Sequence, residues 1–317
     1  MSLIRRLATF VLPATAVAVL IGMLFIGGCD RGPTAAKGDP VPAGPTEAVR
    51  QLIQDLRNDD LPAYARHALP PDLHRRMEVG WSEGRTIWPL TELPLDDRLS
   101  AFISVLAAPE AEKELLAAYN RQFAGADREL RSAAATLGLF AGQYVQGAAE
   151  YSDAEREHYL QLIAALSEWG RQAPLGDPER ARRVIPSLVA AARTTGLAGP
   201  EAFARNGMER SLTRLGPFFS RMKQVLAEYG LDLDASLAGS QVTLIQQTGD
   251  TARVSVAYEV SGRPVVAEVL LERRDGRWYL TDLLRHAEAE AGPAAGPAPA
   301  PAPPVPVPAP GPATNSP

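Results

Sequence analysis

The hydrophobic pattern of this chain changes abruptly after Asp234, from the period of a helix to the period of two that a half-buried strand requires. Turn dipeptides separate four alternating runs, at Gly249-Asp250, Ser261-Gly262 and Asp275-Gly276. Asp-Gly between alternating runs is a strong hairpin signal. The clearest run places apolar side chains at every second position, at Val254, Val256, Tyr258 and Val260. We therefore predict a four-strand antiparallel meander over residues 240–285.

Before this switch the pattern is helical, with amphipathic stripes and recognisable helix starts. Capping residues or early prolines mark these starts at Thr46, Asp60, Pro70-Pro71, Ser152, Asp177 and Gly199-Pro200. Residues 80–95 have no clear period and are expected to form a loop, and the last long helix is expected to bend at Gly216-Pro217. The sheet has to bury its apolar face against these helices, so the predicted fold class is α+β with a helix-rich body.

The first residues have the parts of an export signal: Arg5 and Arg6, an apolar run over residues 7–26, and then Ile26-Gly27-Gly28-Cys29. This last sequence resembles the bacterial lipobox. The resemblance implies cleavage between Gly28 and Cys29 and attachment of lipid to the Cys29 thiol, which belongs to the only cysteine of the chain. The alternative is an uncleaved transmembrane helix over residues 7–26. In both cases the bulk of the chain lies outside the cytoplasm, because the arginines stay inside.

Both ends of the chain lack the composition of a packed core. Residues 29–45 are rich in Gly and Pro and are expected to form a flexible tether, with Asp30 resembling the signal that retains a lipoprotein in the inner membrane. Residues 289–317 are expected to be a disordered Pro/Ala-rich tail, since 291–317 hold 11 prolines and 8 alanines. The predicted periplasmic domain therefore spans residues 46–288.

The two ends of this domain carry a second resemblance. Pro45-Thr46-Glu47-Ala48-Val49, with Asn58-Asp59-Asp60 and the closing Asp275-Gly276-Arg277-Trp278-Tyr279-Leu280, resembles the ends of NTF2-like lipoproteins of uncharacterised function. The resemblance covers residues 45–78 and 240–285 and implies a long helix in the concavity of a curved sheet, with a possible pocket between them. Residues 95–230 would then be a large helical insertion.

The chain shows no motif that assigns a reaction. His67, His74, His158 and His286 lack the spacing of a zinc site, so no metal and no cofactor is predicted. The cluster of Glu155, Glu157 and His158 is interpreted as a solvated helix start, where acids complement the helix dipole. Tyr64, Trp81 and Trp88 are interpreted as core residues rather than the lining of a groove. The formal net charge of −5 does not favour a nucleic-acid partner.

Three functions are compatible with these patterns. The first hypothesis is a non-enzymatic lipoprotein of the cell envelope, which is held on the membrane by lipid on Cys29 and binds an envelope protein or a small apolar ligand. The second is a hydrolase or isomerase whose active site is the cone between helix and sheet. An Asp or His at the floor of that cone would favour the enzyme, and a filled or purely apolar cone would exclude it. The third is a wall-spanning spacer built on the Pro/Ala tail.

Overall fold

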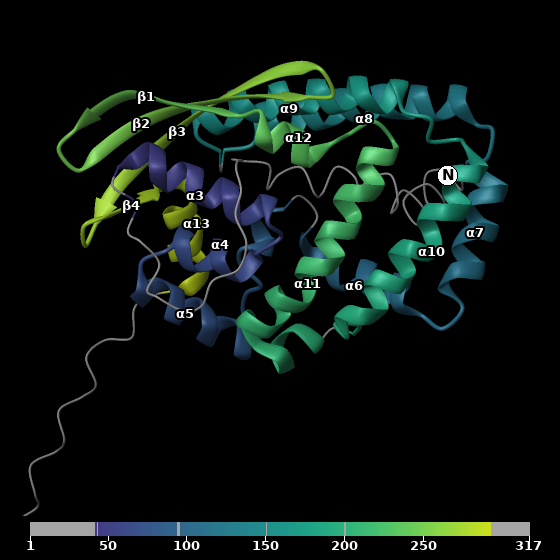
Figure 1. Ribbon diagram of the computed structural model, residues 1–317, viewed down its shortest axis with the longest axis horizontal. Helices are drawn as coiled ribbons and strands as arrows, with labels where there is room; N and C mark the ends of the chain where they lie inside the picture. The colour runs from purple at the N-terminus through teal and green to yellow at the C-terminus, as the bar shows by residue number, and fades with distance from the viewer. Residues whose placement is uncertain (1–41, 43, 94–95, 150, 200, 293–317) are drawn as a thin grey trace, which may run out of the picture.

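The computed structural model describes residues 42, 44–93, 96–149, 151–199 and 201–292. The lipobox and residues 293–317 of the Pro/Ala tail lie outside this part of the chain, while residues 289–291, predicted to belong to the disordered tail, form the end of a helix. Within it, a helical body carries a four-strand antiparallel sheet that follows most of the helices in sequence. The predicted α+β fold class is confirmed. Figure 1 shows the sheet at one end of the molecule and α6, α7 and α10 at the other.

The sheet is the predicted meander. Its strands are hydrogen-bonded in the order β1-β2-β3-β4, namely Gln241–Thr248, Thr251–Val260, Arg263–Arg274 and Arg277–Leu280. Each connection is a two-residue turn, at the three dipeptides that the sequence indicated. The second turn has φ of 50° at Ser261 and 78° at Gly262, and the third has 51° at Asp275 and 81° at Gly276. Positive φ at both central residues matches the right-handed twist of the flanking strands.

The alternation of β2 is also confirmed, because Val254, Val256, Tyr258 and Val260 are all buried. Strand β1 differs from the expectation of a half-buried strand. A bulge between Leu244 and Gln246 interrupts its pairing with β2, and Val242 is its one buried residue. A bulge on an edge strand disturbs the row of backbone groups that could pair with another chain.

The helices fall into two groups. Those outside residues 95–230 are α3 (Pro45–Arg57), α4 (Leu61–Ala68), α5 (Pro71–Ser82), the short 3-10 helix η1 (Leu90–Glu92), α12 (Leu233–Ala238) and α13 (Thr281–Ala291). Those of the larger helical region are α6 (Asp96–Ala107), α7 (Ala111–Gln122), α8 (Asp127–Gly147), α9 (Asp153–Gln172), α10 (Pro178–Thr195) and α11 (Ala202–Glu228). Helix α3 packs on β1, β2 and β4, and α9 packs along β3. The two groups share one hydrophobic core.

Four local expectations were wrong. Residues 80–95 are not all loop, because the buried Trp81 extends α5 and η1 forms after Pro89. Thr46 does not cap α3, because its hydroxyl donates to Glu47 and the N-cap is Gly44. Helix α13 follows β4 without having been predicted. The break in α11 lies at Gly207 rather than at Gly216-Pro217, since Gly207 has φ of 70° and ψ of 176°.

Gly216 has a different role, because it lets α11 approach the turn after α3. A Cβ at this position would lie 2.7 Å from the backbone oxygen of Asp59. A contact with backbone cannot be relieved by a side-chain rotation, so only glycine fits here without a shift of the helix. The close approach brings the next turns of α11 against the C-terminus of α3.

Lys223 of α11 lies buried at this junction, with only 2% of its side chain exposed. Its ammonium group lies 2.8 Å from Asp59 and forms an ion pair with Asp234 of α12. It also donates to the backbone oxygens of Leu56 and Arg57, in the last turn of α3, where carbonyls lack the partner that a continuing helix would supply. A cation at a helix C-terminus complements the helix dipole. One side chain thus joins α3, α11 and α12.

We predict that Lys223→Met lowers the free energy of unfolding by roughly 3 kcal/mol at neutral pH, because it leaves carboxylates without their buried partner. Burial raises the pKa of Asp59, so protonation of this group should reduce the loss as pH falls. Urea unfolding at pH 7 and pH 5 measures both effects. The double variant Lys223→Met/Asp59→Asn is the control and should recover part of the stability. An equal loss of unfolding free energy in the single and the double variant would show that the charge of Lys223 does not contribute to stability through Asp59.

Candidate functional site

A pocket lies between the N-terminal part of α9, β3 and the start of α13. The cavity has a volume of about 80 Å³, which is room for a few water molecules or one small ligand. Its polar lining consists of Tyr64, Glu92, Glu155, His158, Tyr159, Glu268, Asp282 and His286. Its apolar lining includes Ala267, Val269, Leu280 and Leu283. The pocket therefore combines apolar side chains of β3 and α13 with a larger number of hydrogen-bonding groups.

The pairing of the strands explains why the pocket forms at β3. Strand β4 pairs only with residues 271–274 of β3, so within the described sheet the preceding part of β3 has a strand on one side only. Helix α9 lies along that open edge, where the backbone N–H of Val266 donates to Gln161 at 2.9 Å. The chain then leaves β4 directly into α13, which also packs against β3. The pocket is the space that these three elements leave between them.

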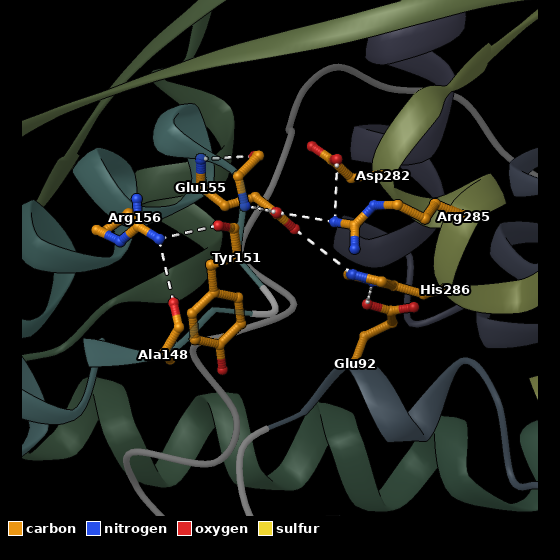
Figure 2. A network of polar contacts seen from close by, with 9 residues as sticks. Glu92, Ala148, Tyr151, Glu155, Arg156, Asp282, Arg285 and His286 are labelled. Atoms are coloured by element: carbon orange, nitrogen blue, oxygen red, sulfur yellow. Dashed lines mark hydrogen bonds and ion pairs between the residues drawn. The ribbon is translucent and has the colours of Figure 1, made fainter. Parts of the chain in front are cut away.

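Glu155 is positioned by a capping box at Ser152, where the sequence predicted the start of a helix. The Ser152 hydroxyl accepts from the backbone N–H of Glu155, and the Glu155 carboxylate accepts from the backbone N–H of Ser152 at 2.8 Å. The same carboxylate accepts a hydrogen bond from Arg285 at 3.0 Å and lies 3.7 Å from Nε2 of His286. Glu155, in the first turn of α9, therefore also lines the pocket, and Figure 2 shows its contacts with Arg285 and His286.

His286 of α13 lies between two carboxylates (Figure 2). Its Nδ1 is 2.8 Å from Glu92, and its Nε2 faces Glu155. Glu92 is itself held by the indole N–H of Trp88, which donates to it at 2.9 Å. The hydrogen bond with Glu92 raises the pKa of His286, against the opposing effect of burial. The protonated imidazole is therefore favoured, and in that form both ring nitrogens are donors.

Arg285 completes the polar chain between α13 and α9. Its guanidinium donates to Glu155 and, at 3.2 Å, to Asp282 at the start of α13. Together the ion pairs join η1, α9 and α13 around one side of the pocket. Hydrogen bonds in which both partners are charged are shorter and stronger than neutral ones, so this wall is held in place before any ligand binds.

The interpretation of Glu155, Glu157 and His158 as one solvated face was wrong for two of the three residues. His158 is only 3% exposed, and Glu155 is largely buried by the network above, while Glu157 is exposed. The ring of His158 faces β2, where Nε2 lies 2.6 Å from the hydroxyl of Tyr258. Burial lowers the pKa of His158 to about 3, so the imidazole is neutral at physiological pH. A sequence signal existed, because His158 continues the buried stripe of Leu162, Ala165 and Trp169.

Two tyrosines add neutral hydroxyl groups to the lining. Burial raises the pKa of both Tyr64 and Tyr159 far above the usual value. Their phenols therefore stay protonated and can donate a hydrogen bond. Tyr64, Trp81 and Trp88 are buried as expected for core residues, and Tyr64 lines the pocket as well.

The remaining predicted site residues lie elsewhere. His67 of α4 pairs with Asp55 of α3 at 2.7 Å, away from the pocket, and burial raises the pKa of that carboxyl group. His74 is mostly covered and lies 3.9 Å from Glu78. Within the described ranges no group of three or more His, Cys, Asp or Glu residues could hold a metal ion. Gly28, Cys29 and Asp30 lie outside the described residues.

Comparisons with known proteins give no relationship for this chain: no protein-family model, no curated protein and no solved structure matches it. The resemblances to lipoproteins and to NTF2-like proteins therefore stay predictions. Among the helices of the described part of the chain, none combines the length and the apolar character needed to cross a bilayer.

The titration of His158 gives a prediction for stability. Because its pKa is lower in the folded than in the unfolded protein, the stability it contributes is present above about pH 6.5 and is lost as pH falls toward 3. In the wild type the free energy of unfolding should fall as the solution is acidified. We expect His158→Phe to make this fall less steep, by up to about 1.4 kcal/mol per pH unit. Urea unfolding between pH 7.5 and pH 4 measures the slope.

His286→Gln is the control for this experiment. The pKa of His286 is shifted upward, so its stabilising effect is complete below about pH 6.5 and is lost as pH rises through its folded value. The control should change the slope above pH 6.5 and leave the acid limb as in the wild type. An acid limb that is unchanged in His158→Phe would contradict the assignment of a neutral buried imidazole.

Proposed function

We propose that this chain is a lipoprotein of the cell envelope, anchored on the periplasmic side through lipid on Cys29, whose folded domain binds a small ligand in the pocket between α9, α13 and β3. The anchor is supported by the order of charged, apolar and small residues before the single cysteine. Asp30 favours retention in the inner membrane. Residues 29–45 provide a tether between the bilayer and the domain.

The observation that carries the binding function is the pocket with its prearranged polar wall. A site that combines an apolar wall with a few fixed hydrogen-bonding groups is the usual form of a small-molecule site. The wall of Glu92, Glu155 and His286 favours a ligand with a hydrogen-bonding group at one end, and Val269 and Leu283 favour an apolar group at the other. A ligand with both characters fits the pocket better than the wholly apolar one expected from the sequence.

A second candidate function is acid–base catalysis, the hydrolase or isomerase of the sequence analysis. His286 supports it, because an imidazole with a raised pKa between two carboxylates can deliver a proton and regain it. In a binding module the same residue only orients the ligand. The two functions differ in one observable: an enzyme changes the bound molecule, and a binding module returns it unchanged.

The lipid anchor predicts a difference between the wild type and Cys29→Ala in a bacterium that processes lipoproteins. The wild type should lose residues 1–28, gain the mass of acyl chains and fractionate with membranes, because acylation of the thiol supplies membrane affinity. The variant should stay unacylated. Intact mass and membrane fractionation test this. A wild type that keeps its leader and carries no lipid would instead support a transmembrane helix over residues 7–26.

The pocket predicts that the wild-type protein purified from membranes retains a small molecule. Ala154 lines the pocket in the first turn of α9, so Ala154→Phe should fill the pocket and lose that molecule. Ala164→Phe is the matched control, because Ala164 is exposed on the same helix. Native mass spectrometry, followed by mass analysis of the material released on denaturation, measures occupancy. Equal occupancy in the two variants, or an empty wild type, would contradict the proposed site.

A further inference from the structure

Helix α8 presents an unusually apolar surface to solvent. Within the described residues, α9 is the only element with which α8 makes extensive contact. The contact is close because Gly138 faces Ser167: a Cβ at Gly138 would lie 2.5 Å from the serine hydroxyl. The rest of α8 stays exposed and includes four of the ten large apolar side chains that are most exposed in this part of the chain: Leu137, Leu139, Phe140 and Tyr144.

Three of these side chains lie in one stripe. Ala133, Leu137, Phe140 and Tyr144 are exposed and follow one another at intervals of four, three and four residues. Alternating intervals of four and three residues are those of the apolar positions along the contact between two supercoiled helices. The stripe is turned away from Gly138 and Val145, which face α9, so it can contact a further helix without displacing α9.

The stripe is complementary to itself when a second copy of α8 runs antiparallel to the first. If the twofold axis passes between positions 138 and 139, Ala133 faces Tyr144 of the second copy and Leu137 faces its Phe140. At each end of the contact the small side chain of Ala133 meets the large side chain of Tyr144. At the centre Leu137 meets Phe140. Alternation of small and large side chains across facing positions is what fills a helix–helix contact without voids.

The distribution of charge agrees with this arrangement. Residues 132–149 contain no charged side chain, and the charges of α8 are confined to its first turns at Asp127, Arg128, Glu129 and Arg131. In the antiparallel register Arg128, Glu129 and Arg131 face positions 149, 148 and 146 of the other copy, which are uncharged. The same distribution disfavours a bilayer surface as the partner, because helices that lie on membranes carry Lys or Arg along their polar face.

We propose that α8 is a homodimer interface, formed by antiparallel packing of Ala133, Leu137, Phe140 and Tyr144 against the same residues of a second copy of this chain. A helix of 21 residues is about 31 Å long, so a stripe about 10 Å wide buries roughly 300 Å² on each partner. This area is well below the roughly 800 Å² per partner of a standard interface, and the dimer is accordingly weak in dilute solution. Confinement on a membrane raises the effective concentration and favours it.

The test uses the full-length chain in living cells, with Tyr144 replaced by the photo-crosslinking residue benzoylphenylalanine in one tagged copy and a second copy carrying a different tag. Irradiation should give an adduct that contains both tags. The same replacement at Val79, which is 51% exposed on α5, is the control and should give none. Adducts with lipid or with another protein, and none between the two tags, would overturn the proposal.

Charge variants then test the register. Leu137→Glu alone and Phe140→Lys alone should each reduce the adduct at least tenfold, because each places a charge in an apolar contact. In the double variant Leu137→Glu/Phe140→Lys the antiparallel register pairs opposite charges, so the adduct should return. A parallel register would pair like charges and give no return. An adduct that persists in the single variants, or is not restored in a double variant whose urea unfolding matches the wild type, would refute this interface.

Discussion

The arrangement of the whole domain depends on the buried ammonium group of Lys223. The last carbonyls of α3 have no partner within their own helix, and Lys223 supplies one while it also neutralises Asp59 and Asp234. Helix α3 packs on the sheet, α11 belongs to the helical region, and α12 leads directly into β1. The position of this single cation therefore sets where the sheet begins relative to the helices, and Gly216 allows the approach that the contact requires.

The pocket follows from that placement of the sheet. A longer β4 would pair with all of β3 and leave no open edge for α9. Because β4 ends at Leu280 and the chain turns at once into α13, a helix from the larger helical region can close the sheet from the side. The lining thus combines segments from both parts of the domain. This explains why the larger helical region contributes Glu155, His158 and Tyr159 to the site.

The strands and their turns could be predicted because their signals are local: alternation of apolar residues and dipeptides that accept positive φ. The capping box at Ser152 is local in the same way. The site could not be predicted, because Glu92, Glu155 and His286 approach one another only after η1, α9 and α13 have packed. For His158 and α13 the sequence carried a signal, but the signal was incomplete. The buried spacing of Leu284, Ala287 and Ala291 was visible in the sequence, but the four-residue strand before them gave no sign of where the sheet would end.

The start of α9 links the pocket to the surface of α8. The side chain of Arg156 donates to the backbone oxygens of Ala148 and Tyr151, both in the α8–α9 connection, and so fixes how the chain enters the capping box (Figure 2). That capping box holds the carboxylate of Glu155 against Arg285 and His286. A shift of α8 relative to α9 would therefore move a polar group of the pocket by way of backbone contacts. Gly138 opposes such a shift, because its close contact with Ser167 leaves the two helices little freedom to slide.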